Sequence, residues 1–163
     1  MASDVIVRDL EPADVAAAVA IAVAAWEPIF ASFRRILGEE LYAAIRPDPA
    51  AAKAAQVRAA CEADSSAHAC VAELDGRVVG FATYYAKPSG VGEIGNNAVR
   101  PDCRGRGIAP RMYAYVQERL KALGMRFVEV ATGGEASHAP ARRAYEKAGF
   151  DIQLPKVTYY RKL

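Results

Sequence analysis

The sequence predicts one α+β domain that spans residues 1–163. Three observations predict this fold class. Apolar residues recur at helical spacing through the first third of the chain, tight turns separate strand-like segments in its middle, and strand and helix patterns alternate in its last third. Hydrophobic residues make up 53% of the 163 residues, which is enough for one core. No repeat, linker or low-complexity stretch divides the chain, so we expect a single domain.

Helices dominate the N-terminal third. The run VIVRDL at residues 5–10 is typical of a short strand, and Pro12 suits the first turn of a helix. The apolar stretch 14–26 is shorter than a bilayer requires and rich in alanine, so we expect it to form a buried helix. Pro28 is expected to end one helix and start another. The predicted helices span residues 12–26, 29–45 and 51–63.

A β-meander is expected next. The dipeptide Asp75-Gly76 separates two strand patterns, residues 67–74 and 77–86, and such a dipeptide is the strongest short signal of a hairpin. A second turn at residues 88–90 leads to a third strand at residues 91–99. The result is three antiparallel strands in chain order.

The C-terminal third alternates strands and helices. A helix begins at Ile108 and is stopped by Gly124, with one apolar face that carries Ile108, Met112, Tyr115, Val116, Leu120 and Leu123. A strand is expected at residues 126–132, and a helix at 139–149 with Ser137 or His138 as its N-cap. Residues 150–163 are expected to form further strand structure.

Charge and cysteine content exclude several classes of function. The chain has 21 basic and 19 acidic residues. The resulting net charge of +2 is too small for the broad positive surface that binds nucleic acid. The three cysteines, Cys61, Cys70 and Cys103, suggest neither a disulfide framework nor a zinc site, so we expect reduced thiols, no metal and a cytoplasmic location. The first residues lack the basic and apolar regions of a signal peptide.

The segment RPDCRGRGIAPRMY, residues 100–113, predicts a local anion site. Gly105 and Gly107 expose the backbone just before a helix, and a helix N-terminus attracts phosphate. A Walker A loop is excluded because no glycine precedes Lys-Ser or Lys-Thr. The dinucleotide fingerprint fails because Pro110 stands where it needs its third glycine.

This loop resembles motif A, R/Q-x-x-G-x-G/A, of the GCN5-related N-acetyltransferases, the GNAT superfamily. Arg104, Gly107 and Ala109 match it, and Val99-Arg100-Pro101 resembles the V-x-P before the motif. The run ARRAYEKAGF, residues 141–150, resembles the family's A-x-x-x-Y-x-x-x-G-F helix. The resemblance implies a mixed, mostly antiparallel central sheet, flanked by helices and splayed where coenzyme A binds. It also implies acetyl-CoA as co-substrate, with its pyrophosphate at Arg104, Gly105, Arg106, Gly107, Ile108 and Ala109.

The same resemblance implies roles for other residues. Main chain at Ala98 or Val99 would contact the thioester carbonyl. Tyr145 would reprotonate the leaving thiolate, and its ordinary pKa of ~10 keeps its proton at neutral pH. Glu93 is the candidate base, and the alternatives are Glu129, Glu135, His138 or a water. His138 stands where many members carry an asparagine that contacts the pantetheine arm.

The resemblance predicts an N-acetyltransferase that acts by direct attack of a primary amine. The aromatic residues of the first helices and central strands would build the acceptor pocket: Trp26, Phe30, Phe33, Tyr84 and Tyr85. No acidic cluster stands out there, so a polycation such as an aminoglycoside is not favoured, while a small amine, an amino acid or a peptide stays open. The alternative is a non-catalytic acyl-CoA-binding module. We expect no nucleic-acid or membrane partner, and a homodimer is one assembly that the sequence allows.

Overall fold

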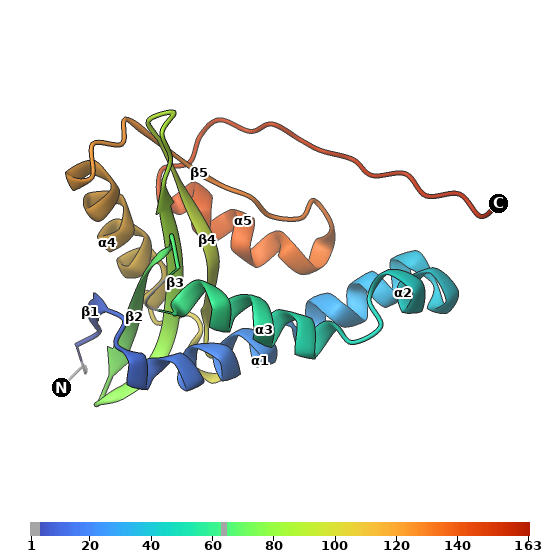
Figure 1. Cartoon of the computed structure of the whole chain (residues 1–163), viewed down its shortest axis with the longest axis horizontal. Helices are drawn as coiled ribbons and strands as arrows, with labels where there is room; N and C mark the ends of the chain where they lie inside the picture. The colour runs from blue at the N-terminus through green and yellow to red at the C-terminus, as the bar shows by residue number, and fades with distance from the viewer. Residues whose placement is uncertain (1–3, 63–64) are drawn as a thin grey trace.

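The computed structural model describes residues 4–62 and 65–163, and its centre is one five-stranded sheet (Figure 1). Residues 1–3 and 63–64 lie outside it, so the first residues of the signal-peptide prediction and the last residue of the predicted helix 51–63 are not described. The strands are β1 (Ile6–Asp9), β2 (His68–Leu74), β3 (Arg77–Ala86), β4 (Val91–Val99) and β5 (Phe127–Val130). They lie side by side in chain order. The predicted α+β class is confirmed.

The sheet is antiparallel from β1 to β4 and parallel between β4 and β5. The predicted hairpin is present, with Asp75 and Gly76 between β2 and β3. Gly92 of β4 lies against the Leu120 side chain, where an added Cβ would come within 2.7 Å of a Leu120 methyl carbon. A glycine in this strand therefore lets a helix pack close to the sheet.

Helices cover both faces of the sheet (Figure 1). Helices α1 (Val15–Leu37) and α3 (Pro49–Cys61) share one core cluster with Val71 of β2 and Phe81 of β3. Helix α2 (Glu39–Ile45) follows α1 after Gly38, whose φ of 76° ends the first helix. Helices α4 (Ile108–Ala122) and α5 (Ala139–Lys147) bury Val116 and Tyr145 with Tyr84 on the other face.

Helix α1 differs from the prediction because it continues through Pro28. An interior proline removes one intrahelical hydrogen bond. Side-chain contacts on either side of Pro28 and with α2 stabilise the helix in spite of this loss. The Trp26 and Phe30 rings lie 5.8 Å apart, and Arg34 lies over the Tyr42 ring. The segment Pro12–Leu37 is therefore long and apolar enough to cross a membrane by length and composition alone. In the fold, one face of this segment packs in a core cluster through Ala18, Ile21 and Ala22.

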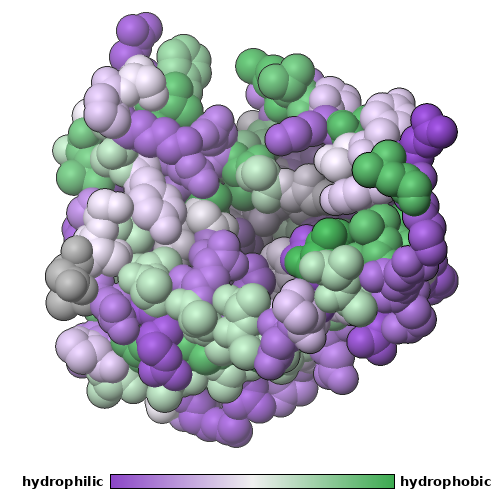
Figure 2. All heavy atoms as spheres, turned by 45° about the vertical axis from the view of Figure 1, so that its right-hand side comes forward, coloured by the Kyte–Doolittle hydropathy of each residue, from purple (hydrophilic) through white to green (hydrophobic). Residues whose placement is uncertain are grey.

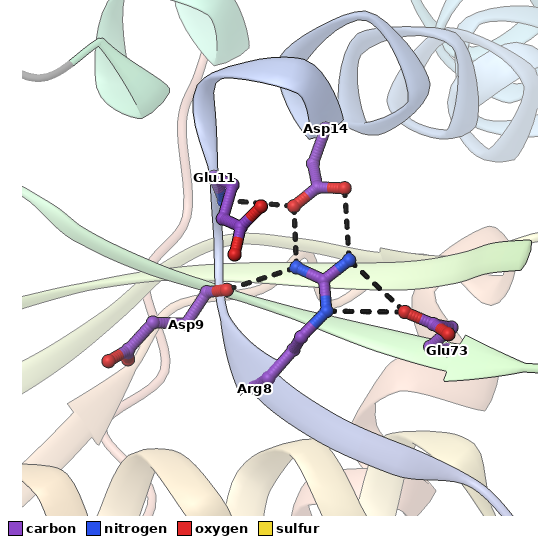
Figure 3. Close-up of polar contacts among 5 residues, drawn as sticks. All are labelled: Arg8, Asp9, Glu11, Asp14 and Glu73. Atoms are coloured by element: carbon purple, nitrogen blue, oxygen red, sulfur yellow. Dashed lines mark hydrogen bonds and ion pairs between the residues drawn. The ribbon is translucent and has the colours of Figure 1, made fainter. Parts of the chain in front are cut away.

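A partly buried ion pair fixes the start of α1 to the sheet (Figure 3). Arg8 of β1 donates to both carboxylate oxygens of Asp14, at 2.7 and 3.2 Å, and to Glu73 of β2 at 3.2 Å. The Asp14 carboxylate also accepts the Glu11 N–H at 2.9 Å. The Arg8 hydrogen bond lowers the pKa of Asp14 below its ordinary range, although burial opposes the shift.

Residues 151–163 form no strand, which corrects the prediction for the C-terminus. The segment leaves the domain after α5 and runs outward as an extended tail, drawn in red in Figure 1. All its residues are exposed, and they include large apolar side chains: Ile152, Leu154, Val157, Tyr159, Tyr160 and Leu163. The residue types favour a strand, but within one chain the tail meets no strand edge to pair with.

Candidate active site

The loop before α4 exposes its backbone. Gly105 and Gly107 have φ of 77° and 73°, a left-handed conformation that glycine adopts most readily. An added Cβ at either position would meet nothing within 4 Å, so the loop borders open space. The N–H groups of Gly105, Arg106 and Gly107 donate to no protein acceptor in the described part of the chain.

The same loop forms the N-terminus of α4. Gly107 is the N-cap and provides no side-chain acceptor for the first turn. The free N–H groups and the helix dipole therefore favour a bound anion. Arg104 and Arg106 are exposed beside the loop, Ala109 is half-buried, and Ile108 is buried in the core, so Ile108 has only backbone to offer a ligand.

Strand β4 separates from β5 beside this loop. The two strands pair only over Val91–Ile94 of β4, and a register shift opposite Thr83 marks a bulge at Gly95 and Asn96. Beyond the bulge, one edge of β4 has no neighbouring strand among residues 4–62 and 65–163, as the predicted splay requires.

The direction of the β4 backbone distinguishes the two predicted carbonyl contacts. Arg100 N–H bonds to the Val79 carbonyl of β3 at 2.8 Å. Backbone groups alternate in direction along a strand, so Ala98 also faces β3 and the N–H of Val99 faces the open edge. The geometry therefore favours the main chain of Val99 over that of Ala98 as the contact for the thioester carbonyl.

Tyr145 belongs to a buried polar cluster that crosses from α5 to β4. Its hydroxyl accepts a hydrogen bond from Asn97 Nδ2 at 3.1 Å, while Asn97 Oδ1 accepts from the Tyr113 hydroxyl at 2.8 Å. Asn97 Oδ1 also accepts a hydrogen bond from the Tyr145 hydroxyl at 3.3 Å. Burial raises the pKa of Tyr145, so the phenol keeps its proton at neutral pH. The sequence analysis gave no role to Asn97 or Tyr113, although asparagine is uncommon inside a strand.

Glu93 shares a lysine with a second carboxylate. The Lys87 ammonium forms ion pairs with Glu93 and with Glu129, the latter at 2.5 Å. Glu93 and Glu129 stand opposite each other across the β4–β5 pair. Two of the predicted candidate bases therefore lie together on one cation, and both carboxylates raise the pKa of Lys87.

His138 lies at the start of α5, and its side chain is directed to other partners than the helix. His138 is the N-cap residue of α5, one of the two predicted positions, but its side chain forms no capping hydrogen bond. Instead, His138 Nδ1 bonds to the Glu135 carboxylate, and the ring is buried against Trp26 and Phe33. The pKa of Glu135 is lowered overall. Burial alone would raise this pKa, but the hydrogen bonds from His138 and Ser137 outweigh burial.

One groove of about 1500 Å³ joins these parts (Figure 2). Its wall includes Arg104, Gly105 and residues 107–110 of the loop and the start of α4. It also includes the open edge of β4, Glu93, Tyr145 and His138. Arg143 of α5 also lines it, whereas Arg142 binds the Gly133 and Glu135 carbonyls.

The end of the groove away from the loop is aromatic. Trp26, Phe30, Phe33 and Tyr85 line it, as predicted, together with Arg46 and Lys53, which the sequence analysis missed. Tyr84 does not line it, because its ring is buried in the core and stacks on His68.

The cysteines and acidic residues suggest no other chemistry. Cys61, Cys70 and Cys103 are free, and burial raises the pKa of Cys61 to about 11 and of Cys70 to about 12. Within residues 4–62 and 65–163, no cluster of histidine, cysteine and acidic side chains has the composition of a metal site.

Comparison with known proteins places the chain among acetyltransferases. Residues 30–150 match the model of a family described as Acetyltransferase (GNAT) family. No curated protein sequence matches. Several solved structures share the fold over nearly the whole chain.

One is the aminoglycoside N-acetyltransferase AAC(6')-Iy, solved with the bisubstrate analogue CoA-S-monomethyl-acetylneamine. It is 22% identical, with a TM-score of 0.67 and 99% of each chain covered. A second is the PaiA N-acetyltransferase of Thermoplasma acidophilum with coenzyme A, 16% identical, with a TM-score of 0.70 over 92% of this chain and 91% of the other. A third is a ribosomal-protein-alanine N-acetyltransferase of Brucella melitensis biovar Abortus 2308, 18% identical, with a TM-score of 0.58 over 98% and 99%. At these identities the likeness shows the fold, and the named acceptors belong to those proteins.

Proposed function

The chain belongs to the GNAT acetyltransferase family, and on this premise we propose that it transfers the acetyl group of acetyl-CoA to a primary amine. The acceptor is a small molecule, an amino acid or a peptide, and its amine attacks the thioester directly. Solved relatives of the same fold bind coenzyme A, which supports the choice of donor.

The observation that carries the proposal is the uncapped loop before α4. Gly105, Arg106 and Gly107 offer N–H groups without partners in the part of the chain that the structure describes, and the space beside the two glycines is open. Arg104 and Arg106 add positive charge next to these groups. Such a loop fits the pyrophosphate of acetyl-CoA, and the groove that runs from it past β4 has room for the pantetheine arm.

Acetyl-CoA would supply an activated acyl group, and the remaining chemistry belongs to the protein. The Val99 N–H faces the open edge of β4, where it would donate to the thioester carbonyl as negative charge develops there. The Tyr145 hydroxyl accepts from Asn97 Nδ2 at 3.1 Å and donates to Asn97 Oδ1 at 3.3 Å. Release of the longer bond would turn its proton toward the departing sulfur.

We propose Glu93 as the base that removes a proton from the acceptor amine. Its carboxylate lines the groove on the strand that carries Val99. The ion pair with Lys87 stabilises the carboxylate as an anion, and this anion would take the amine proton through a bound water. The alternative is His138, whose buried imidazole is oriented by Glu135.

We also propose that the protein is a homodimer and that it is cytoplasmic, with no nucleic acid or membrane as partner. The tail 151–163 exposes six large apolar side chains, and β5 at the end of the sheet leaves Phe127 63% exposed. A second copy would cover both surfaces if each tail paired with the other copy's β5. The free thiols support a reducing compartment.

A thiol-release assay with acetyl-CoA across amine classes tests the proposed activity. The expected result is free coenzyme A in amounts equal to an N-acetylated product found by mass spectrometry. Coenzyme binding without thiol release for any amine would instead identify a non-catalytic acyl-CoA module. Absence of coenzyme binding would contradict the proposal entirely.

A further inference from the structure

Two cations lie close together at the aromatic end of the groove. Arg46, just after α2, places its guanidinium 4.9 Å from the centre of the Phe33 ring. Lys53 of α3 places Nζ 3.6 Å from the centre of the Trp26 ring and is buried. The aromatic faces hold both charges at the groove wall.

No carboxylate in the described part of the chain neutralises this pair. Lys53 Nζ donates to Gln56 Oε1 at 2.7 Å and to Asn96 Oδ1 at 3.3 Å, and both acceptors are neutral. The Arg46 guanidinium has neither a hydrogen-bond partner nor an ion-pair partner among residues 4–62 and 65–163. Burial and the nearby Arg46 lower the pKa of Lys53 to about 8, so the fold holds two mutually repelling charges here.

The groove offers little negative charge elsewhere. Among its described lining residues the only acid is Glu93, and Lys87 already neutralises its carboxylate. A bound anion would relieve the repulsion between Arg46 and Lys53, whereas a polycation would increase it. Arg46 is exposed and has free donors, so it would make the direct contact, with Lys53 adding charge behind it.

We infer that the acceptor is an amine that also carries a carboxylate, and that Arg46 and Lys53 bind this carboxylate. Trp26, Phe30 and Phe33 border the same space and would hold an apolar body between the two polar ends. The substrate class is therefore an apolar amino acid or a similar amine acid. The inference rests on the proposed acetyl transfer and specifies its acceptor.

This acceptor differs from that of one structural relative. AAC(6')-Iy is named as an aminoglycoside acetyltransferase, and aminoglycosides are polycations. A polycation would have to enter beside two uncompensated positive charges. We therefore expect a similar fold to serve a different acceptor here.

Matched acceptors test the inference. Thiol release from acetyl-CoA is measured with phenylalanine, leucine and tryptophan, with their amides, with phenethylamine and with an aminoglycoside. At least one amino acid should have a KM at least tenfold below that of its amide, and the aminoglycoside should be the poorest substrate.

Two variants locate the effect. Arg46→Met and Lys53→Met keep an apolar stem and remove the charge, and each should reduce the preference for acid over amide to less than threefold. Arg58→Met makes the same change on an exposed position of α3 that does not line the groove, and it should keep the preference. Arg46 is exposed, so its variant should fold even if the buried Lys53 variant does not.

Binding provides a second readout. Trp26 is the only tryptophan and lies at this end of the groove, so its fluorescence should respond to an N-acetylamino acid added with coenzyme A. The N-acetylated amide should bind more weakly, except in Arg46→Met. Thiol release without preference for the acids, or with preference for the aminoglycoside, would overturn the inference and leave the proposed function standing. Absence of thiol release from every amine would overturn both.

Discussion

Replacing Tyr145 with phenylalanine separates catalysis from packing at the centre of the site. The ring is buried against Tyr113 and Phe150 and stays in the variant, so only the hydroxyl is lost. Asn97 keeps partners without it, because Nδ2 still donates to the Gly95 carbonyl at 3.1 Å and Oδ1 still accepts from Tyr113. No buried polar group is therefore left without a partner.

The stability cost of Tyr145→Phe should accordingly be that of one net hydrogen bond, about 1 kcal/mol. For a chain of this size that corresponds to a fall in Tm of roughly 2–4 °C. The kcat should fall about 100-fold or more if protonation of the leaving thiolate limits the rate. Thermal unfolding, coenzyme affinity and steady-state thiol release measure the three quantities.

Tyr113→Phe is the matched control, because it removes a hydroxyl from the same cluster at a comparable cost in stability. Its kcat should fall less than tenfold, since Asn97 still holds Tyr145. Burial raises the pKa of Tyr145 above its ordinary 10, so the wild-type rate should show no loss from tyrosine ionisation below about pH 9.5. Wild-type turnover in Tyr145→Phe would refute the acid role and leave Tyr145 as a core residue.

Three further predictions concern the base, the ion pair and the tail. Glu93→Gln should lower kcat and remove the acid limb of the pH–rate profile, while His138→Asn leaves that limb in place; the reverse pattern would identify His138 as the base. Asp14→Asn should destabilise the protein by roughly 1–3 kcal/mol at pH 7 in chemical denaturation. Because Arg8 lowers the folded-state pKa of Asp14 below 3.8, this difference should be complete above about pH 4 and shrink as the pH falls further; a pH-independent difference would contradict the ion pair. Deletion of residues 151–163 should convert a dimer to a monomer in sedimentation, and an unchanged mass would contradict strand pairing between copies.

Local sequence patterns predicted much of the fold. The Asp75-Gly76 turn and the glycines before α4 depend on neighbours within a few residues, and the structure confirms them. The predicted apolar face of α4 is confirmed in part, because Leu123 is exposed and Tyr115 half-buried. The course of α1 through Pro28 was not predicted, because contacts such as that between Arg34 and Tyr42 join separate helices.

In the site, too, features that depend on near neighbours could be predicted, and features that depend on distant contacts could not. The loop could be located from its glycines, but the Asn97 bond to Tyr145 joins residues 48 positions apart. The Arg46–Lys53 pair likewise appears only when α3 is placed beside Trp26. The tail failed as a predicted strand because strand propensity does not provide a partner edge.

Calorimetric titration of acetyl-CoA into wild-type protein, Gly107→Asp and Gly107→Asn tests the central claim, that the loop before α4 binds the coenzyme pyrophosphate. Both side chains tolerate the left-handed backbone of Gly107, where an added Cβ meets nothing within 4 Å, so both variants should fold. The two side chains are similar in size and differ in charge. We predict one site in the wild type, affinity reduced less than tenfold in Gly107→Asn, and affinity reduced at least 100-fold in Gly107→Asp. Wild-type affinity in a folded Gly107→Asp variant would contradict the account.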